Sequence, residues 1–183
     1  MRRALVVVDM VNDFIEASGA LSCGAAGLRA VEPALARVRD SRERGDFIVF
    51  ACDAHAPADP EFELWPRHCV AGTRGAELYG PLQAFYETYA DEGQDLHYLP
   101  KMHYDAFHET DLDSLLRERG VGEVAIAGVC TSICCYATAG GAYFRRYRVL
   151  IDPSAMADLT PEAHAFAVRH MQDVYRARVL QRA

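Results

Sequence analysis

Short apolar runs rich in β-branched residues recur along the chain, and stretches with helical spacing separate them. The first run, ALVVVD at 4–9, is continuous, as expected for a strand buried on both faces. Five further runs are predicted strands: 47–52, 96–100, 123–128, 147–152 and 175–180. The stretches between them are predicted helices: 25–44, 82–90, 110–120, 132–146 and 160–173. This alternation predicts an α/β fold of three Rossmann-like layers, a mostly parallel sheet of five or six strands with helices on both faces.

Punctuating residues suggest where several helices start and stop. Gly45 follows the pattern of 25–44 as a stop signal, and Pro33 inside that pattern favours a helix start near it. Thr110 and Thr160 are candidate N-caps of the predicted helices 110–120 and 160–173. These signals predict boundaries rather than topology.

Length and charge narrow the class of protein. The 183 residues, without repeats or a linker, predict one domain spanning 1–183. A net charge of -7 with no Lys/Arg run argues against nucleic-acid partners. No apolar run approaches the roughly 20 residues that span a bilayer, and the N-terminal run stops at Asp9 without a cleavage site, which favours a strand over an export signal. Six cysteines in apolar surroundings favour reduced thiols and a cytoplasmic protein.

Chemistry-bearing residues stand directly after the predicted strands, where parallel α/β sheets bind ligands. Asp9 ends the first strand, Asp53 and His55 follow the second, Lys101 the third, and Cys134 the fourth. The turn after the first strand, DMVNDF, has no glycine, which disfavours nucleotide binding.

Asp9, Lys101 and Cys134 suit a nucleophile with its base and an orienting charge. A thiol at a helix N-terminus has its thiolate favoured by the helix dipole and by a cation such as Lys101. Asp9 could take the thiol proton, and backbone N–H groups around Cys130 and Cys134 could cradle an oxyanion. Each residue alone also suits a plainer role: an ion-pair partner, a surface lysine, a small core residue. The residues by themselves leave both interpretations open.

The segment GVCTSICCYATAGG at 128–141 carries three cysteines, which raises other kinds of site. A CxxC redox motif is absent, and a structural zinc site would need a second ligand pair at matched spacing, which is not evident. Among the kinds of functional site, one reactive thiol therefore remains, beside the plainer role of a core cysteine.

Residues 53–80 contain several prolines and show no helical or strand-like spacing of apolar residues, so they are predicted to form a long loop. Long ordered loops in compact domains are usually functional. Asp53, His55 and His68, with carboxylates between them, suit zinc, iron or manganese; the alternative is a solvated acidic loop with incidental histidines. Trp65, the only tryptophan, is either loop packing or a pocket wall. Four further histidines without paired partners are interpreted as structural: His103, His108, His164 and His170.

These motifs together resemble the isochorismatase-like cysteine hydrolases, and within them the nicotinamidases. The matching segments follow the family's order over nearly the whole chain: VVVDMVNDF, CDAHAP with PEFELWPRHCVAGTRGAELYG, LPKMHYDAF, TDLDSLLRERGV and GVCTSICCYATAGGAYFRRYRV. The resemblance implies hydrolysis of nicotinamide to nicotinate and ammonia through a cysteine thioester, in NAD salvage.

The resemblance also assigns residues. It implies catalytic roles for Asp9, Lys101 and Cys134, with an oxyanion hole at Cys130 and Cys134 after a cis Val129–Cys130 peptide. It implies one divalent metal, zinc before iron or manganese, on these ligands, with Glu63 as the fallback for Glu61: Asp53, His55, Glu61 and His68. It implies these substrate-binding residues: Phe14, Trp65, Tyr104 and Ile133.

Three positions depart from the family's usual residues. Ser132 stands where aspartate is common, Asp105 where serine is common, and Cys135 where valine is usual. The first two are expected at the edge of the pocket, so the exact substrate stays open. The alternatives are another small amide or an N-carbamoyl compound, and a catalytically retired binding member. Family members often self-associate, so a homo-oligomer is also an expectation.

Overall fold

A six-stranded parallel sheet forms the centre of the protein in the computed structural model, which describes residues 1–90, 93 and 95–181. Its spatial order is β3-β2-β1-β4-β5-β6, and every neighbouring pair is parallel. The strands are β1 (Arg2–Val8), β2 (Phe47–Asp53), β3 (Leu96–Lys101), β4 (Val121–Val129), β5 (Arg148–Ala157) and β6 (Arg178–Val179). The predicted α/β architecture is confirmed.

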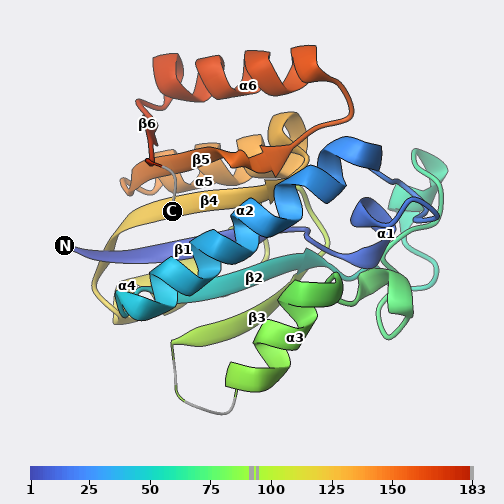
Figure 1. Cartoon of the computed structure of the whole chain (residues 1–183), viewed down its shortest axis with the longest axis horizontal. Coiled ribbons are helices and arrows are strands. Elements are labelled where there is room, and N and C mark those ends of the chain that lie inside the picture. Colours follow the sequence, from blue (N-terminus) through green and yellow to red (C-terminus); the bar gives the residue numbers. More distant parts are fainter. Residues whose placement is uncertain (91–92, 94, 182–183) are drawn as a thin grey trace.

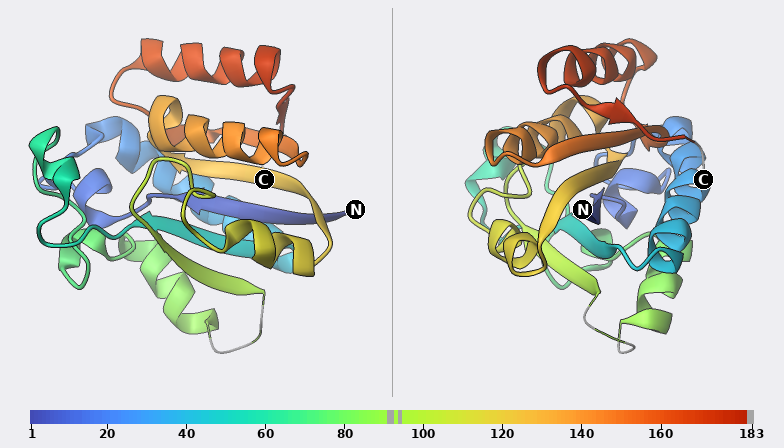
Figure 2. Two further views of the ribbon diagram at one scale, coloured as in Figure 1. Left: turned by 180° about the vertical axis from the view of Figure 1, so that it is seen from behind. Right: turned by 90° about the vertical axis from the view of Figure 1, so that its left-hand side faces the viewer.

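Helices cover both faces of this sheet (Figures 1 and 2). The α-helices are α1 (Asn12–Ile15), α2 (Gly24–Glu43), α3 (Gly80–Tyr89), α4 (Leu112–Glu118), α5 (Tyr136–Phe144) and α6 (Pro161–Val174). Shorter helical turns are η1 (Pro60–Glu63), η2 (Arg74–Ala76) and the π-helical η3 (Thr131–Cys135). In Figure 1, α2 and α3 lie in front of the sheet; the view from behind in Figure 2 shows α4 and α5 on the opposite face.

The alternation of side chains along the strands divides the core in two. On β1, Leu5 and Val7 pack under α2, whereas Val6 and Val8 face the side of α4 and α5. Both sets are fully buried, which explains why the β1 segment is continuously apolar rather than alternating.

Two predicted helix starts are wrong. Helix α2 runs through Pro33 and begins at Gly24, because Ala30 and Ala34 on either side of the proline are buried on one helix face. Helix α4 begins at Leu112, and Asp111 occupies its N-cap position. Thr160 does cap α6, since its hydroxyl oxygen accepts from the Ala163 N–H at 3.1 Å.

Gly128 marks the closest approach of β4 to β1. Its φ is +122°, and a Cβ there would lie 2.0 Å from the carbonyl oxygen of Val8, which belongs to rigid strand backbone. We therefore expect Gly128→Ala to lower the free energy of unfolding by about 3 kcal/mol or more, from backbone strain together with overpacking. Urea denaturation measures this loss. Gly45→Ala is the matched control, because Gly45 also has a positive φ but nothing lies within 4 Å of its missing Cβ. An equal loss in both variants would contradict the steric explanation.

Candidate active site

The strand order reverses between β1 and β4, which places a ligand-binding crevice at their carboxyl ends. Asp9 follows β1, Asp53 ends β2, Lys101 ends β3, and Cys134 lies in η3 directly after β4. All four side chains are buried. The structure thus brings together residues that are up to 125 positions apart in the sequence, counted from Asp9 to Cys134.

A lysine joins two carboxylates at the floor of this crevice. The Lys101 Nζ donates to Asp9 Oδ2 at 2.8 Å and also to Asp53 Oδ1. The backbone N–H of Asp53 donates to Asp9 Oδ1 at 2.8 Å. Ligand atoms of Asp9, Asp53 and Cys134 all lie within 4.8 Å of one another, so the thiol lies beside the Asp9 carboxylate.

Burial sets the protonation states of these groups. Burial raises the pKa of Asp9 to about 6, and the neighbouring Asp53 charge adds to this, against the opposing effect of Lys101. Burial would lower the pKa of Lys101, but the two carboxylates raise it well above its usual range. Burial also raises the pKa of the Cys134 thiol well above its ordinary value, although Lys101 opposes the shift. The expected standing thiolate is therefore corrected: Cys134 rests as a thiol beside an ionised base.

The nucleophile turn has the expected cis peptide between Val129 and Cys130. Residues at the end of β5 and after it hold this turn, and only His164 among them was singled out from the sequence. The buried Asp158 carboxylate accepts from the Ser132 N–H at 2.6 Å. The Thr131 hydroxyl donates to the Ala157 carbonyl at 3.0 Å and lies 2.9 Å from Nδ1 of His164. His164 therefore has a structural role, and it exerts that role on the turn that carries Cys134.

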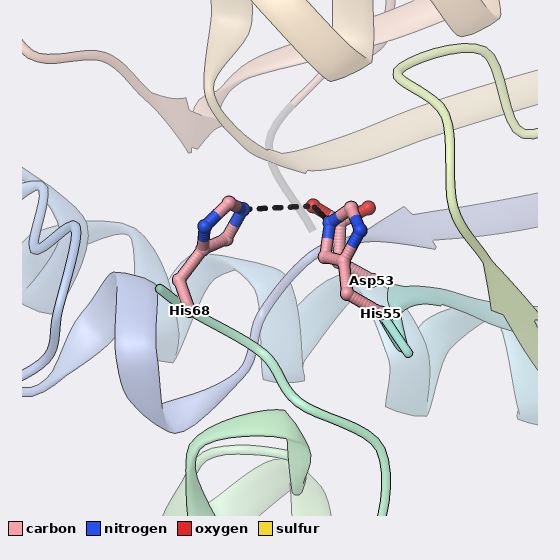
Figure 3. Close-up of side chains that lie close together, drawn as sticks. All are labelled: Asp53, His55 and His68. Carbon is pink, nitrogen blue, oxygen red and sulfur yellow. Dashed lines mark ion pairs between the residues drawn. The ribbon is translucent and has the colours of Figure 1, made fainter. Parts of the chain in front are cut away.

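Asp53, His55 and His68 form a second buried cluster beside the first (Figure 3). Their ligand atoms all lie within 4.8 Å of one another. The Nε2 atoms of His55 and His68 lie 3.6 and 3.9 Å from Asp53 Oδ2, while Asp53 Oδ1 faces Lys101. Asp53 therefore connects the two clusters through its two oxygens.

The donor set of this cluster fits a divalent metal. Nδ1 of His68 lies 2.7 Å from the Pro66 carbonyl, which only accepts, so Nδ1 carries the proton and Nε2 presents its lone pair. Nδ1 of His55 lies 3.0 Å from Asp59 Oδ2. Its Nε2 is buried and, within the described part of the chain, has no hydrogen-bond partner, which a cation would supply. The Asp53 carboxylate, 3.6 Å from Nε2, raises the pKa of His55, so a proton and a metal would compete there.

Within the described residues, the cluster of Asp53, His55 and His68 does not include Glu61. Glu61 nevertheless lines the same cavity as Asp53 and His68. Its Oε1 accepts from the Tyr104 hydroxyl at 2.9 Å, and Trp65 Nε1 donates to that hydroxyl at 3.0 Å. Glu63 is exposed. Position therefore favours Glu61 over Glu63 as a further ligand.

A cavity of about 310 Å³ opens above both clusters, and Cys134 lines it. The four expected substrate-binding residues line it too: Phe14, Trp65, Tyr104 and Ile133. So do Cys130, which was expected through its backbone, and residues that the sequence did not single out: Ala20, Leu21, Ser22 and Leu159. The walls are thus mostly apolar and aromatic.

The two departures expected at the pocket edge lie elsewhere. Asp105 points to α5, where Gly141 leaves room for its carboxylate, and its Oδ1 accepts from the Phe107 N–H at 2.9 Å. Ser132 is engaged through its N–H by Asp158. Neither residue is among those that line the described cavity, so the expectation that they shape it is corrected. Cys135 is fully buried in the core under α5.

The described helices include none that is both long enough and apolar enough to cross a membrane.

Residues 3–182 match the family model of the isochorismatase domain. A nicotinamidase/pyrazinamidase of Mycobacterium tuberculosis is 35% identical over 175 residues, which cover 88% of this chain and 91% of the relative.

Solved structures of nicotinamidases and pyrazinamidases share the fold of this chain. The structure of nicotinamidase/pyrazinamidase PncA from Bacillus subtilis superposes with a TM-score of 0.96 at 38% identity, covering 99% of this chain and all of the other. A pyrazinamidase of Pyrococcus horikoshii in complex with zinc gives a TM-score of 0.86 at 31% identity, covering 99% of each chain. With the fold, the family match and these relatives in agreement over almost its full length, the chain belongs to the isochorismatase family.

Proposed function

We propose that the protein is a nicotinamidase, which hydrolyses nicotinamide to nicotinate and ammonia through a thioester on Cys134. The observation that carries this proposal is the buried set of Asp9, Lys101 and Cys134 at the floor of an aromatic cavity. The names of the relatives support the same activity.

The reaction begins with the pyridine ring between Phe14 and Trp65 and the carboxamide carbon at Cys134. Asp9 takes the thiol proton as the sulfur attacks, and the backbone N–H groups of Cys130 and Cys134 stabilise the oxyanion, at about 3–4 kcal/mol per donor. Asp9 then returns the proton to the departing ammonia. Water attacks the thioester while Asp9 accepts its proton. The C–S bond then breaks, Asp9 returns that proton to the sulfur, and the product leaves as nicotinate after losing its carboxylic proton to solvent.

Lys101 keeps Asp9 in place through this cycle. Its ammonium is fixed between two carboxylates, so it orients Asp9 and offsets negative charge when the thiol proton moves. The raised pKa of Asp9 makes it a stronger base than a solvent-exposed aspartate, while it stays mostly ionised at neutral pH.

The proposal includes one divalent metal, zinc before iron or manganese, held by Asp53, His55, His68 and Glu61. When bound, it would supply a Lewis acid for the pyridine nitrogen of the substrate. The zinc complex of the Pyrococcus relative supports zinc. The proposal also places the enzyme in NAD salvage in the cytoplasm, which six free cysteines support.

The second candidate is hydrolysis of another small amide or an N-carbamoyl compound. The aromatic walls and the histidine–carboxylate donor set favour a flat heteroaromatic amide with a ligating ring nitrogen. A retired binding member is disfavoured because Lys101 pairs with Asp9 and the Cys134 sulfur lies within 4.8 Å of the Asp9 carboxylate.

Ammonia release across nicotinamide, pyrazinamide, benzamide and an N-carbamoyl amino acid tests this proposal. We expect nicotinamide and pyrazinamide to be hydrolysed, and benzamide, which lacks the ring nitrogen, to be a poor substrate. Preference for the carbamoyl compound would favour the second candidate, and no turnover of any amide would favour the retired member.

The pH profile reports the state of Asp9. Because burial raises the pKa of Asp9 to about 6, protonation below that pH removes the base that takes the thiol proton. We expect kcat/KM for nicotinamide to be level near neutrality and to fall below about pH 6, approaching tenfold per pH unit. Steady-state assays between about pH 4.5 and 8, with folding checked by circular dichroism, measure this fall in kcat/KM on the acidic side. A rate that stays level to about pH 4.5 would contradict this role.

Metal removal has a readout apart from turnover. We expect dialysis against a chelator to remove one metal per chain and to change the fluorescence of Trp65, the only tryptophan, which is linked to Glu61 through the Tyr104 hydroxyl. His68→Ala should lower the metal content by one per chain in elemental analysis. His103→Ala is the control, because His103, His108 and Glu109 form an exposed cluster of comparable ligand spacing. Metal lost from His103→Ala and kept by His68→Ala would relocate the site.

A further inference from the structure

Two thiols from distant parts of the chain meet in the wall of the cavity. The sulfur atoms of Cys23 and Cys130 lie 3.3 Å apart, although 107 residues separate them in the sequence. Cys23 is buried at the N-cap position of α2. Cys130 follows the cis peptide and lines the cavity. The proposed reaction uses neither thiol group.

Both cysteines belong to segments that shape the substrate cavity. Leu21 and Ser22, directly before Cys23, line it, and the Cys23 N–H donates to the carbonyl of Phe14 at 2.8 Å. On the other side, Cys130 begins the turn that carries Cys134. A covalent link between the two sulfurs would therefore join two segments of the cavity wall that are far apart in the sequence.

The environment of the pair suits oxidation. Its open side is Cys130, which a small solute in the cavity can reach, whereas Cys23 lies behind it. The hydrogen bond between the two thiols lowers the pKa of Cys23 and raises that of Cys130, which favours Cys23 as the attacking thiolate. Access from the cavity, not thiolate character, marks Cys130 as the thiol that a peroxide meets. The sulfurs need to approach by only a little over 1 Å to reach the ~2.05 Å of a disulfide.

We propose that Cys23 and Cys130 are a reversible oxidation site, at which a peroxide entering the cavity produces a disulfide that reshapes the substrate pocket. Peroxide oxidises the Cys130 thiol to a sulfenic acid, with release of one water. The Cys23 sulfur then attacks the Cys130 sulfur, the S–S bond forms, the S–O bond breaks, and a second water leaves. The two thiols lose two electrons and two protons, and the peroxide is reduced to water.

The disulfide would act on substrate turnover through position. Cys130 moves toward Cys23, and its backbone N–H belongs to the proposed oxyanion hole. A displacement of about 1 Å near reacting groups can cost roughly 100-fold in rate, so we expect kcat/KM to fall by about tenfold or more. This part rests on the proposed function, whereas formation of the disulfide does not.

Peptide mapping of the purified enzyme tests the site directly. The enzyme is treated with limiting hydrogen peroxide, alkylated under denaturing conditions and digested. We expect a peptide linking Cys23 to Cys130, which dithiothreitol removes as it restores activity. If both thiols remain alkylatable while Cys134 is oxidised, the proposed site is wrong, whatever the substrate of the enzyme.

Variants separate this disulfide from oxidation of the nucleophile. Cys23→Ala should keep full activity before oxidation and form no linked peptide. In the wild type, part of the activity loss should rise with the amount of linked peptide. Cys23→Ala should lack that part and lose activity only as its Cys134 is oxidised. Cys135→Ala is the matched control and should still form the 23–130 link. A linked peptide in the wild type without any loss of activity would overturn the effect on the pocket.

Discussion

We expect the replacement of Cys134 with alanine to abolish ammonia release from nicotinamide and to leave the protein folded. Without the sulfur no thioester can form, so we expect kcat/KM to fall by about 10⁴-fold or more, as for other nucleophile deletions. Cys134 is 6% exposed and lines the cavity, so the lost methyl-sized volume opens to that cavity rather than to closed core. The measurement is coupled detection of ammonia, with thermal unfolding as the check on folding.

The adjacent thiol provides the control. Cys135 is fully buried in the core under α5, so Cys135→Ala should cost some stability and keep most of the turnover. Trapping with hydroxylamine during turnover should yield nicotinohydroxamate from the wild type and none from Cys134→Ala. Turnover retained by Cys134→Ala, or an acyl group mapped to another cysteine, would refute the proposed nucleophile.

The strand-end positions of Asp9, Lys101 and Cys134 could be predicted because parallel strands end at one edge of the sheet. The apolar runs fixed which residues follow each strand, and the order β3-β2-β1-β4 then brings them together. Spacing alone could not show that Asp53 would touch Lys101 as well as the histidines. That contact depends on the register of β2 with β3, which pairs Asp53 with Lys101.

Other features depended on tertiary contacts without a local signal. Asp158 holds the turn at Ser132, and Cys23 meets Cys130, across gaps that no local pattern encodes. Pro33 gave a local signal that pointed the wrong way, because the packing of α2 on the sheet outweighs the cost of a proline within the helix. The expectation that Asp105 lies at the pocket edge was wrong, because its carboxylate fills the space left by the missing side chain of Gly141 on α5. The sequence around Asp105 carries no signal of that contact.

Lys101→Met should have the largest effect on stability. The side chain of Lys101 is fully buried between Asp9 and Asp53, and methionine keeps its length while removing the charge. Two carboxylates would then share a buried site without their cation, so we expect the free energy of unfolding to fall by about 3–5 kcal/mol. Urea denaturation measures the change, and ammonia release should be lost as well.

The pH dependence of that loss distinguishes unpaired charge from lost packing. Burial favours the neutral form of Asp53, and Lys101 lowers its pKa; Asp9 already has a pKa raised to about 6. Without Lys101, the pKa of Asp9 rises further above the unfolded value of about 3.9, and the pKa of Asp53 rises from its lowered native value. The native state then binds more protons than the unfolded state above about pH 4, so its stability falls as the pH rises. We expect the deficit of Lys101→Met relative to the wild type to be small near pH 4 and largest near pH 8.

A second substitution tests the same account from the other side. Adding Asp53→Asn to Lys101→Met removes one of the two uncompensated charges, so the double variant should be more stable than Lys101→Met at pH 8. Asp53→Asn alone should instead destabilise the wild type, because it weakens the pairing of Lys101. This reversal of sign is specific to coupled charges. A deficit that is independent of pH, and additive between the two substitutions, would mean that Lys101 stabilises the fold by packing alone.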